Sequence, residues 1–409
     1  MSDQLPRILS SSVVVLACIL MAAVIARTST FYRGMLGDTA QRELPLDGLR
    51  GLLALGVLAS HCDHAHEWLK TGQWTSNCRL IVFFGQGAVL VFFMITGYLF
   101  WSKAIRAKGR VNPVTLWIGR LRRLGPLYLF SALLVLFGSL SALLAASWPD
   151  RGQYLLRLSS LGLFNWIPLR GFDQTTFNGG VQWSLWFEWR FYLGLPLIAW
   201  FAGGRRVFIL CAFVMACVLA TKSSFGTLGA GYWTAFLPGM LAAYLFQKEG
   251  MRNVLTTPVA AISALIWCIL VLGLTKCSGI RWNFVSLIPG FFAIAAGNTF
   301  FGLLSHPATR LLGTISYSVY LLHCIILMFA LKALRFVIDF NQLQLHYYTL
   351  ILIGIGGLIV MFCSLTYRWL EHPALMWRTP IERRLSSRAS PRHRSGGTIK
   401  SQDASTPKG

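Results

Sequence analysis

The sequence predicts an all-α fold, namely a polytopic bundle of transmembrane helices with about ten core helices and one further helix at the N-terminus. The 409 residues are 55% hydrophobic and only 12% charged, whereas a soluble domain carries about a quarter charged residues. Apolar runs recur along the whole chain, and each extends to roughly the twenty residues that cross about 30 Å of hydrocarbon. The runs are continuous, which predicts helices, because backbone polar groups in lipid must be bonded within their own segment. The same continuity excludes a barrel of alternating strands.

The net charge of +23 is arranged in the pattern of a membrane topology. Lys and Arg concentrate in the segments 103–123, 205–206 and 248–252 and in the tail after Glu371, and these alternate with charge-poor connections. The positive-inside rule describes this alternation and places both ends of the core bundle in the cytoplasm. We therefore expect a multi-pass protein in contact with membrane lipids, and no nucleic-acid partner.

The apolar runs predict the helices in chain order. They are 8–26, 51–66, 80–102, 125–147, 181–201, 207–221, 232–247, 255–273, 284–304, 311–334 and 347–370. Placing 103–124 in the cytoplasm puts the later basic connections on the same side, so the count of ten core helices is consistent with the charges. The leading helix is either a retained span or a cleaved signal peptide, since 24–26 resembles a cleavage site. The four arginines between positions 27 and 50 favour a retained helix.

The ranges divide the chain into three parts. Residues 1–43 form the extra N-terminal transmembrane helix with a cytoplasmic linker, and residues 44–377 form the main transmembrane domain. Residues 378–409 are rich in Ser, Arg, Pro and Gly and are predicted to be a disordered, basic cytoplasmic tail. The connection 148–180 is the longest external one, and its aromatic residues suit a position against the membrane surface, where it would cover a site.

Arg50 and His61 are the first candidates for function, because ionisable side chains at membrane depth are costly. They are eleven residues apart, close to three helical turns, so they share a helix face with His61 about 16 Å deeper. An arginine at the cytoplasmic mouth suits an anionic ligand, and a neutral histidine in the interior suits a general base. The structural alternative is a packing histidine with a snorkelling arginine. The shared face favours the functional interpretation.

Arg120 and Arg123 lie three residues apart, just before an apolar helix whose start is marked by Pro126. Two guanidinium groups on one face can hold a pyrophosphate. Positive-inside anchoring is the better explanation for such a segment taken alone. The functional interpretation gains weight because these arginines share the cytoplasmic side with Arg50.

Glu188 lies about two turns into a helix that enters from the outside, and Ser184 and Tyr192 share its face by their four-residue spacing. A carboxylate at this depth can orient an imidazolium, or it can bind a sugar by hydrogen bonds. The structural alternative is a buried ion pair that fixes the packing of helices.

Two other groups of polar residues are weaker candidates. The segment 315–323 places Ser and Tyr side chains at membrane depth, where such side chains hydrogen-bond between helices. His323 at its end is ranked below His61, because its own helix carries no spaced cationic partner. His64 and His66 crowd one helix end, but they do not share a face and no second cluster completes a shell of four ligands, so no metal is expected.

Six short elements occur in a fixed order along residues 44–373. They are 46–51 with His61, 92–99, 120–126, 183–196, 316–323 and 371–373. In this order they resemble the acyltransferase 3 family of bacterial membrane acyltransferases. Each element alone is weak evidence, whereas the six together are specific. Thr96 replaces the usual serine of its element, and Leu90 stands where some members carry an aspartate, so a catalytic use of that aspartate is absent.

The resemblance implies a ten-helix bundle in the bacterial cytoplasmic (inner) membrane. It also implies an O-acyltransferase that moves an acetyl or other short acyl group from cytoplasmic acyl-CoA to a hydroxyl of an extracytoplasmic glycan. The co-substrate would be acyl-CoA, in the first place acetyl-CoA, and the acceptor a glycan or lipid-linked saccharide such as O-antigen or exopolysaccharide. The roles implied by the family fall on five residues. The catalytic ones are His61 and Glu188, and those that bind the CoA phosphates are Arg50, Arg120 and Arg123.

Two alternatives from other classes stay open. A secondary transporter for an anionic solute would also bury Arg and Glu, but such carriers show inverted repeats, and this sequence shows none. A non-catalytic membrane scaffold would hold the same charges for packing alone. Within the enzyme hypothesis, direct transfer is favoured over a covalent acyl-enzyme, because no cysteine or activated serine is paired with His61. The acyl group, the acceptor and the oligomeric state stay open.

Overall fold

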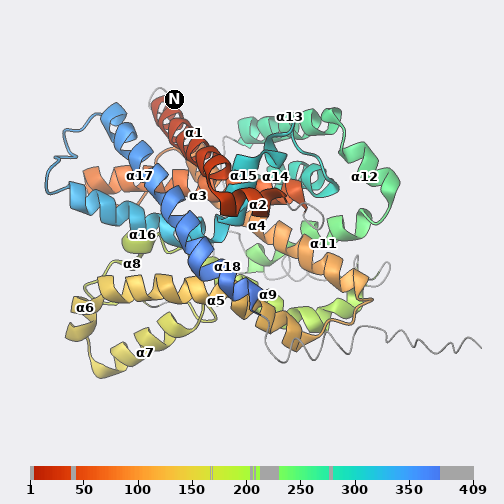
Figure 1. Cartoon of the computed structure of the whole chain (residues 1–409), viewed down its shortest axis with the longest axis horizontal. Helices are drawn as coiled ribbons and strands as arrows, with labels where there is room; N and C mark the ends of the chain where they lie inside the picture. Colours follow the sequence, from red (N-terminus) through yellow and green to blue (C-terminus); the bar gives the residue numbers. More distant parts are fainter. Residues whose placement is uncertain are drawn as a thin grey trace, which may run out of the picture.

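The computed structural model describes residues 4–37, 43–165, 167, 169–202, 206, 209–211, 230–275 and 280–377. Regular structure in this part of the chain is helical apart from one isolated bridge, Leu169 to Phe172, which confirms the all-α fold class. The helices form a bundle in which segments far apart in the chain lie side by side (Figure 1). Six described stretches are long and apolar enough to cross a membrane. These are α1 (Gln4–Thr28), α4 (Arg79–Arg106), α5 (Pro113–Gly138), α13 (Pro258–Thr275), α16 (Ser316–Leu334) and the continuous run Leu345–Met376.

Shorter or more polar helices complete the described bundle. They are α2 (Thr30–Gly37), α3 (Leu44–Thr71), α6 (Leu140–Ala145), α7 (Trp148–Ser159), α8 (Gln174–Asn178), α9 (Trp183–Ile198), α11 (Phe236–Leu245), α12 (Glu249–Leu255), α14 (Ile280–Ala296) and α15 (Pro307–Thr314). The C-terminal run consists of α17 (Leu345–Thr366), a π-helical turn (Tyr367–Glu371) and α18 (His372–Met376), and 3-10 turns lie at Ala199–Ala202, Ala230–Ala235 and Leu303–Ser305. Each predicted range contains helical residues where it is described. In the range 207–221 only residues 209–211 are described, and they are helical, while the tail 378–409 lies outside the described residues.

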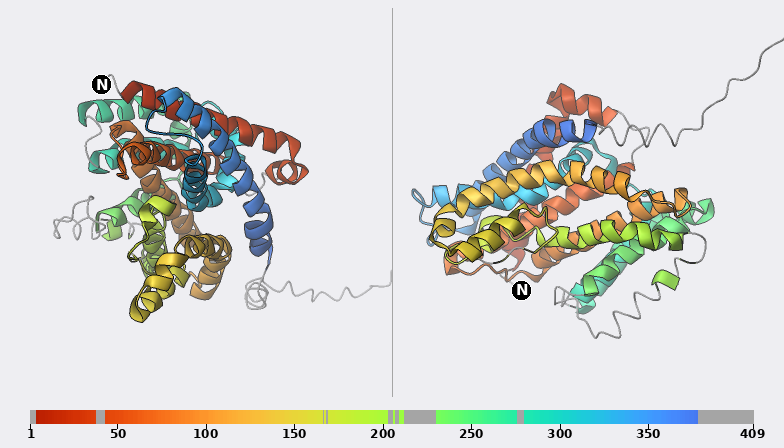
Figure 2. Two further views of the ribbon diagram at one scale, coloured as in Figure 1. Left: turned by 90° about the vertical axis from the view of Figure 1, so that its left-hand side faces the viewer. Right: turned by 90° about the horizontal axis from the view of Figure 1, so that it is seen from below.

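The N-terminal helix α1 packs against α17, α15 and α3. In both views of Figure 2 the red N-terminal helices lie next to the blue C-terminal helix. Arg7 near the start of α1 forms ion pairs with two carboxylates of α3, Asp63 at 3.5 Å and Glu67. The hydroxyl of Tyr32 in α2 donates a hydrogen bond to the backbone oxygen of Ser364 in α17 at 2.7 Å. The leading helices are therefore joined to the bundle by polar contacts at both ends.

Helix α3 begins earlier than predicted, so that Arg50 lies inside the helix. Its first turns cross α15 and the 3-10 turn Leu303–Ser305 before it, with the backbones in close contact. A Cβ atom on Gly48 would overlap the carbonyl oxygen of Leu304, and one on Gly313 would overlap that of Asp47. Only glycine permits this approach. The crossing fixes how far along its axis α3 inserts into the bundle.

Helix α5 also begins before its predicted start at position 125. The side chain of Asn112 accepts a backbone hydrogen bond at 3.1 Å in the first turn, and a proline follows it, which together are a strong start signal. Pro126 therefore lies inside the helix, and the prediction that it marks the start was wrong. As a result, Arg120 and Arg123 lie on the helix itself, about one turn apart.

The predicted helix 311–334 is divided into α15 and α16, which meet at Ile315. The hydroxyl of Ser316 donates a hydrogen bond to the backbone oxygen of Gly313 at 2.8 Å. Side-chain hydroxyls near a helix terminus compete in this way for backbone groups. The division gives α16 an axis of its own.

The external connection 148–180 contains helices α7 and α8. Ser147 caps α7 by accepting a hydrogen bond from the backbone of Asp150, and Asp173 caps α8 by accepting one from Thr176 at 3.1 Å. Such capping stabilises short helices. Because α8 packs against α16, the end of the connection lies over the bundle.

Candidate active site

A cavity of about 280 Å³ lies between α3, α4, α5, α9 and α16. Its charged lining consists of the side chains of Arg50, Lys103, Arg120, Arg123 and Glu188. Four of the five site residues predicted from the sequence therefore meet in one place. Lys103 is exposed, whereas the three arginines are half-buried, so the cavity opens at the end nearest to Lys103, in the basic segment 103–123.

Two of the arginines are held by carboxylates. Arg50 pairs with Asp47, one turn earlier in α3, at 3.7 Å. Arg123 pairs with Glu371 at 3.1 Å, and Glu371 is fully buried. The hydroxyl of Ser318 in α16 donates a hydrogen bond to the same carboxylate.

Glu371 is a site residue that sequence reasoning missed. It lies in the π-helical turn that ends the last apolar run, within the family element 371–373, to which the sequence alone assigns no role. The one signal available was an isolated carboxylate at the end of a membrane helix. Sequence spacing within one helix does not reveal a partner such as Arg123 on another.

Arg120 is held by aromatic rings. Its guanidinium carbon lies 4.7 Å from the ring centroid of Phe100 and 5.5 Å from that of Tyr192. These are cation–π distances, at which a flat guanidinium is attracted to the ring faces. The stacking on the two rings orients the donor groups of Arg120.

Glu188 faces the cavity together with Ser184 and Tyr192, which confirms the predicted common face of α9. The hydroxyl of Tyr192 donates a hydrogen bond to Oε2 of Glu188 at 2.9 Å. The other charged groups around Glu188 in the cavity are cationic. This carboxylate therefore lies in the same part of the bundle as the arginines.

His61 lies outside the set of described residues that line this cavity. Its Nδ1 is 2.7 Å from Nε2 of His323 in α16, and the two rings are nearly parallel, with 19° between their planes. The ring of Trp74 stacks on His61 with 5.9 Å between centroids. The hydrogen-bond partner of His61 is thus His323 and not Glu188, which corrects the alternative in which Glu188 orients His61.

Tyr320 connects the cavity to the histidine pair. Its side chain lines the cavity, and its hydroxyl lies 2.8 Å from Oγ of Ser184 and donates to the backbone oxygen of Val181 at 2.8 Å. His323 follows three residues later in α16, about one turn along the helix. The inner end of the cavity therefore lies about one helical turn from the histidine pair.

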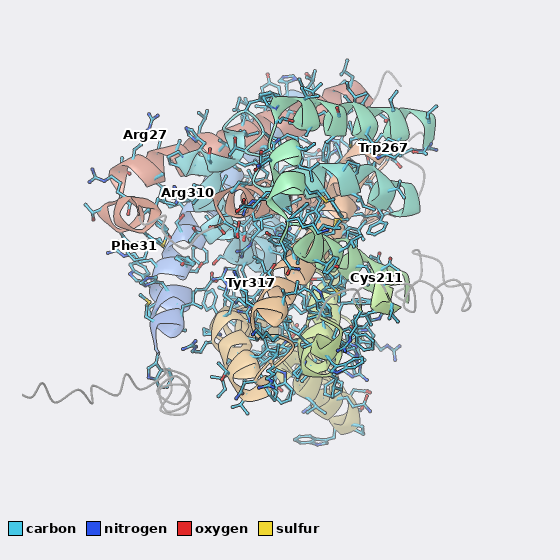
Figure 3. All side chains as sticks on the ribbon, turned by 90° about the vertical axis from the view of Figure 1, so that its right-hand side faces the viewer. Arg27, Phe31, Cys211, Trp267, Arg310 and Tyr317 are labelled. Atoms are coloured by element: carbon cyan, nitrogen blue, oxygen red, sulfur yellow. The ribbon has the colours of Figure 1, made fainter. Side chains whose placement is uncertain are left out.

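Tyr317 fixes α16 at the same level. It lies in the middle of the bundle (Figure 3), and its hydroxyl donates a hydrogen bond to the backbone oxygen of Leu124 in α5 at 3.0 Å. Together with the contacts of Ser318 and Tyr320, this confirms that the polar side chains of 315–323 bond between helices. These bonds hold α16, and with it His323, against α5 and α9.

The end of the external connection covers His61. A Cβ atom on Gly179, whose φ is 69°, would lie 3.1 Å from Cε1 and 3.2 Å from Nε2 of His61. The turn is stabilised by Asn178, whose Oδ1 accepts a hydrogen bond from the backbone N–H of Gly180 at 3.0 Å. His61 therefore directs Nδ1 toward α16 and Nε2 toward the outer connection.

Comparison with known proteins gives a consistent set of relatives. The sequence profile of the acyltransferase 3 family, described as an acyltransferase domain, matches residues 44–368. A protein of Staphylococcus aureus strain MRSA252 named "Putative O-acetyltransferase" is 24% identical over 378 residues, which are 82% of this chain and 58% of that protein. Nodulation protein 10 of Rhizobium leguminosarum bv. viciae is 26% identical over 373 residues, which are 83% of this chain and 95% of that protein.

The lengths of these relatives differ. A protein of the same "Putative O-acetyltransferase" name from S. aureus strain COL is 24% identical over 377 residues, 81% of this chain and 58% of that protein. The chain thus spans less than two thirds of the length of the S. aureus relatives. No solved structure matches the chain.

Proposed function

Because the chain belongs to the acyltransferase 3 family, we propose that it is a multi-pass O-acyltransferase of the bacterial cytoplasmic (inner) membrane. It transfers a short acyl group, acetyl in the first place, from cytoplasmic acyl-CoA to a hydroxyl of an extracytoplasmic glycan or lipid-linked saccharide. The names of the relatives support acetyl as the group. The single observation that carries the proposal is the convergence of Arg50, Arg120 and Arg123 on one cavity.

The three guanidinium groups suit the phosphates of coenzyme A. Arg120 and Arg123 come from one face of α5 and Arg50 from α3, so they approach an anion from two helices. Guanidinium groups bind phosphate oxygens in pairs, through parallel N–H donors. Lys103 at the open end adds a further positive charge for the nucleotide part, which stays outside.

The size of the cavity suits only part of the donor. At about 280 Å³ it is near the lower end of the roughly 300–1,000 Å³ that small-molecule sites occupy. We assign it to the acyl-pantetheine arm, which is long and thin. The arm would point from the arginines toward Ser184 and Tyr320 at the inner end.

His61 is the general base of the proposed reaction. Its Nε2 accepts the proton of the acceptor hydroxyl while the hydroxyl oxygen attacks the carbonyl carbon of the thioester. The tetrahedral intermediate collapses with cleavage of the carbon–sulfur bond, and the thiolate of coenzyme A takes the proton from His61. The products are the O-acyl ester and free coenzyme A. A positioned base of this kind contributes about 10²- to 10⁴-fold to the rate.

Tyr320 has to move for this reaction to take place. The described cavity ends at Ser184 and Tyr320, whereas His61 lies beyond them, so the acyl group reaches His61 when the side chain of Tyr320 turns away. The hydrogen bonds of its hydroxyl with Ser184 and with the backbone oxygen of Val181 hold it in the position that closes the inner end of the cavity. In this mechanism Glu188 acts on the donor side, where it holds Tyr192 and balances the charge of the arginines.

The test is transfer of labelled acetyl from acetyl-CoA by the full-length protein in proteoliposomes, with glycan O-acetylation in cells as the second readout. His61→Ala should abolish both at unchanged expression, and normal acylation would reject His61 as the base. Turnover of the thioester separates the enzyme from a carrier of anionic solutes, because a carrier leaves acetyl-CoA intact. Uptake of label without release of free coenzyme A would reject the proposed function.

A further inference from the structure

We infer that His323 is a positioning residue that fixes the tautomer of His61, so that the bare nitrogen Nε2 faces the acceptor. The inference rests on the proposed function, in which His61 is the general base. It assigns a task to a residue that the family match and the relatives leave without one.

The hydrogen bonds of His323 determine which of its two ring nitrogens carries the hydrogen. Its Nδ1 lies 2.8 Å from the backbone oxygen of Val319 and 3.0 Å from that of Tyr320. Carbonyl oxygens only accept hydrogen bonds, so Nδ1 must carry the hydrogen and donate it. His323 is fully buried, so water does not replace these two backbone oxygens as hydrogen-bond partners of Nδ1.

The tautomer of His61 follows from that of His323. A neutral His323 with its hydrogen on Nδ1 has a lone pair on Nε2. Nδ1 of His61 lies 2.7 Å from that nitrogen, and two lone pairs or two N–H groups facing each other at this distance would repel. For a neutral pair, only one arrangement makes the hydrogen bond. His61 donates from Nδ1, and its Nε2 is left as an acceptor.

The position of Gly179 gives the direction in which Nε2 of His61 points. The Cβ position of Gly179 is 3.2 Å from Nε2, so this nitrogen faces the turn that ends the external connection. His64, the other nearby imidazole, uses its Nδ1 for the backbone oxygen of Ser60 at 2.7 Å. The bare nitrogen of His61 is therefore directed toward the side from which an extracytoplasmic hydroxyl would approach.

This arrangement stabilises the protonated, imidazolium form of His61 that exists during the reaction. When Nε2 of His61 takes the proton of the hydroxyl, the ring becomes an imidazolium, and its Nδ1–H bond to His323 becomes charge-assisted and stronger. A third group that orients the base and stabilises its charged form recurs in nucleophile–base systems. Here an imidazole whose own orientation is fixed by backbone oxygens takes that position.

The direct test is the tautomer of His61 in the unaltered protein. The full-length protein, labelled with ¹⁵N-histidine and embedded in lipid bilayers, is measured by solid-state NMR, with His61→Gln used to assign the resonances. The expected spectrum shows Nδ1 of His61 bonded to hydrogen and Nε2 without hydrogen. A hydrogen on Nε2 of neutral His61 would overturn the inference, whatever the activity.

The kinetic test compares two substitutions of His323. His323→Phe retains a ring but removes the acceptor, and it should lower kcat about 10²-fold, within the range for a general base, while KM for acetyl-CoA stays the same. In His323→Gln the amide oxygen takes the place of Nε2 as acceptor, so this variant should retain kcat within about tenfold. His64→Gln is the matched control and should leave kcat unchanged.

The outcomes separate this inference from the proposed function. If His323→Phe retains full kcat while His61→Ala is inactive, the inference fails and the proposed function stands. If His61→Ala remains active, His61 is not the general base and the positioning role of His323 fails with it, although the acyltransferase function stands. Uptake of label without release of free coenzyme A rejects the proposed function instead, and the NMR spectrum still decides the tautomer. Should His323→Phe not fold, the spectrum of the unaltered protein and the Gln variant provide the decision.

Discussion

Nδ1 of His61 and Nε2 of His323 lie 2.7 Å apart, although 262 positions separate the two residues in the chain. The contact joins α3, which carries Arg50 of the basic cavity, to α16, which carries Tyr320 at the inner end of that cavity. The histidine pair thus lies between two helices that both reach the donor side. Variants in the cavity and variants in the turn at Gly179 can therefore both be compared by their effect on this pair.

Gly179→Ala should impair access to His61. The new methyl group would lie 3.1 to 3.2 Å from the imidazole, and we expect kcat/KM for the acceptor to fall roughly tenfold or more, since tenfold corresponds to only about 1.4 kcal/mol. Gly180→Ala is a matched control. It adds the same methyl group at a similar φ of 61°, but its Cβ would contact only the side chain of Thr175, at 4.0 Å. Equal losses in both variants would show that backbone strain, and not contact with His61, causes the effect.

Arg120→Lys should weaken donor binding. Lysine retains the charge but loses the planar fork and the stacking on Phe100 and Tyr192, so we expect KM for acetyl-CoA to rise about tenfold with little change in kcat. Arg122→Lys on the same helix is the control, because Arg122 donates to the backbone oxygen of Trp377 and does not line the cavity. Initial rates over a range of acetyl-CoA concentrations measure the effect. An unchanged KM in Arg120→Lys would remove this residue from the binding site.

Glu371→Gln should destabilise the protein strongly. The substitution leaves Arg123 half-buried without its carboxylate, and loss of one partner of a buried ion pair costs about 3–5 kcal/mol. We expect a clearly lower unfolding temperature in detergent, and a smaller loss in the double variant Arg123→Met/Glu371→Leu, in which both charges are removed. A double-variant loss equal to the sum of the losses in the single variants Arg123→Met and Glu371→Leu would show that the pair is not coupled.

Tyr320→Phe should open a leak to water. Without its hydroxyl the side chain loses the bonds to Ser184 and Val181, so we expect faster hydrolysis of acetyl-CoA in the absence of acceptor. Tyr348→Phe is the control, since it removes a comparable bond, to the backbone oxygen of Cys62 at 2.9 Å, away from the cavity. Release of free thiol without acceptor is the measurement. Rates equal to that of the unaltered protein would contradict a gating role for Tyr320.

Helix α1 should remain part of the mature protein. Its polar contacts through Arg7 to Asp63 and Glu67 would be lost by cleavage after Ala26, and both carboxylates would lose the cation with which they pair. The intact mass of protein purified from membranes should include residues 1–26, and Arg7→Ala should lower the unfolding temperature. A mass that corresponds to a chain starting at Arg27 would contradict this prediction.

The helices could be predicted from the sequence because an apolar run of about twenty residues is a local property. Their ends were harder to predict. The start of α5 carries a clear signal in Asn112 and the following proline, but three arginines in its second and third turns hide the apolar periodicity that would have extended the helix. The break at Ile315 depends on a hydroxyl of Ser316 and is not visible as a change in hydropathy.

The candidate site was predictable where one helix carries several of its residues. Ser184, Glu188 and Tyr192 share a face by spacing alone, and the structure places all three in the cavity. His323 and Glu371 were ranked low or missed because their partners lie on other helices. Contacts between helices depend on the crossing of backbones, here through Gly48 and Gly313, and spacing along a single helix does not specify them.

Arg50 and His61 are carried by one uninterrupted helix, and their axial separation is therefore constant at about 16 Å. In the proposed mechanism, helix α3 is a rigid spacer between Arg50, which binds the phosphates, and His61, which accepts the proton. A thioester with a truncated arm would bind to the arginines and stay short of the imidazole, so it would inhibit without turnover. Because this helix is continuous, the enzyme would select its donor by the length of the carrier arm. This selection would not depend on the acyl group at the end of the arm.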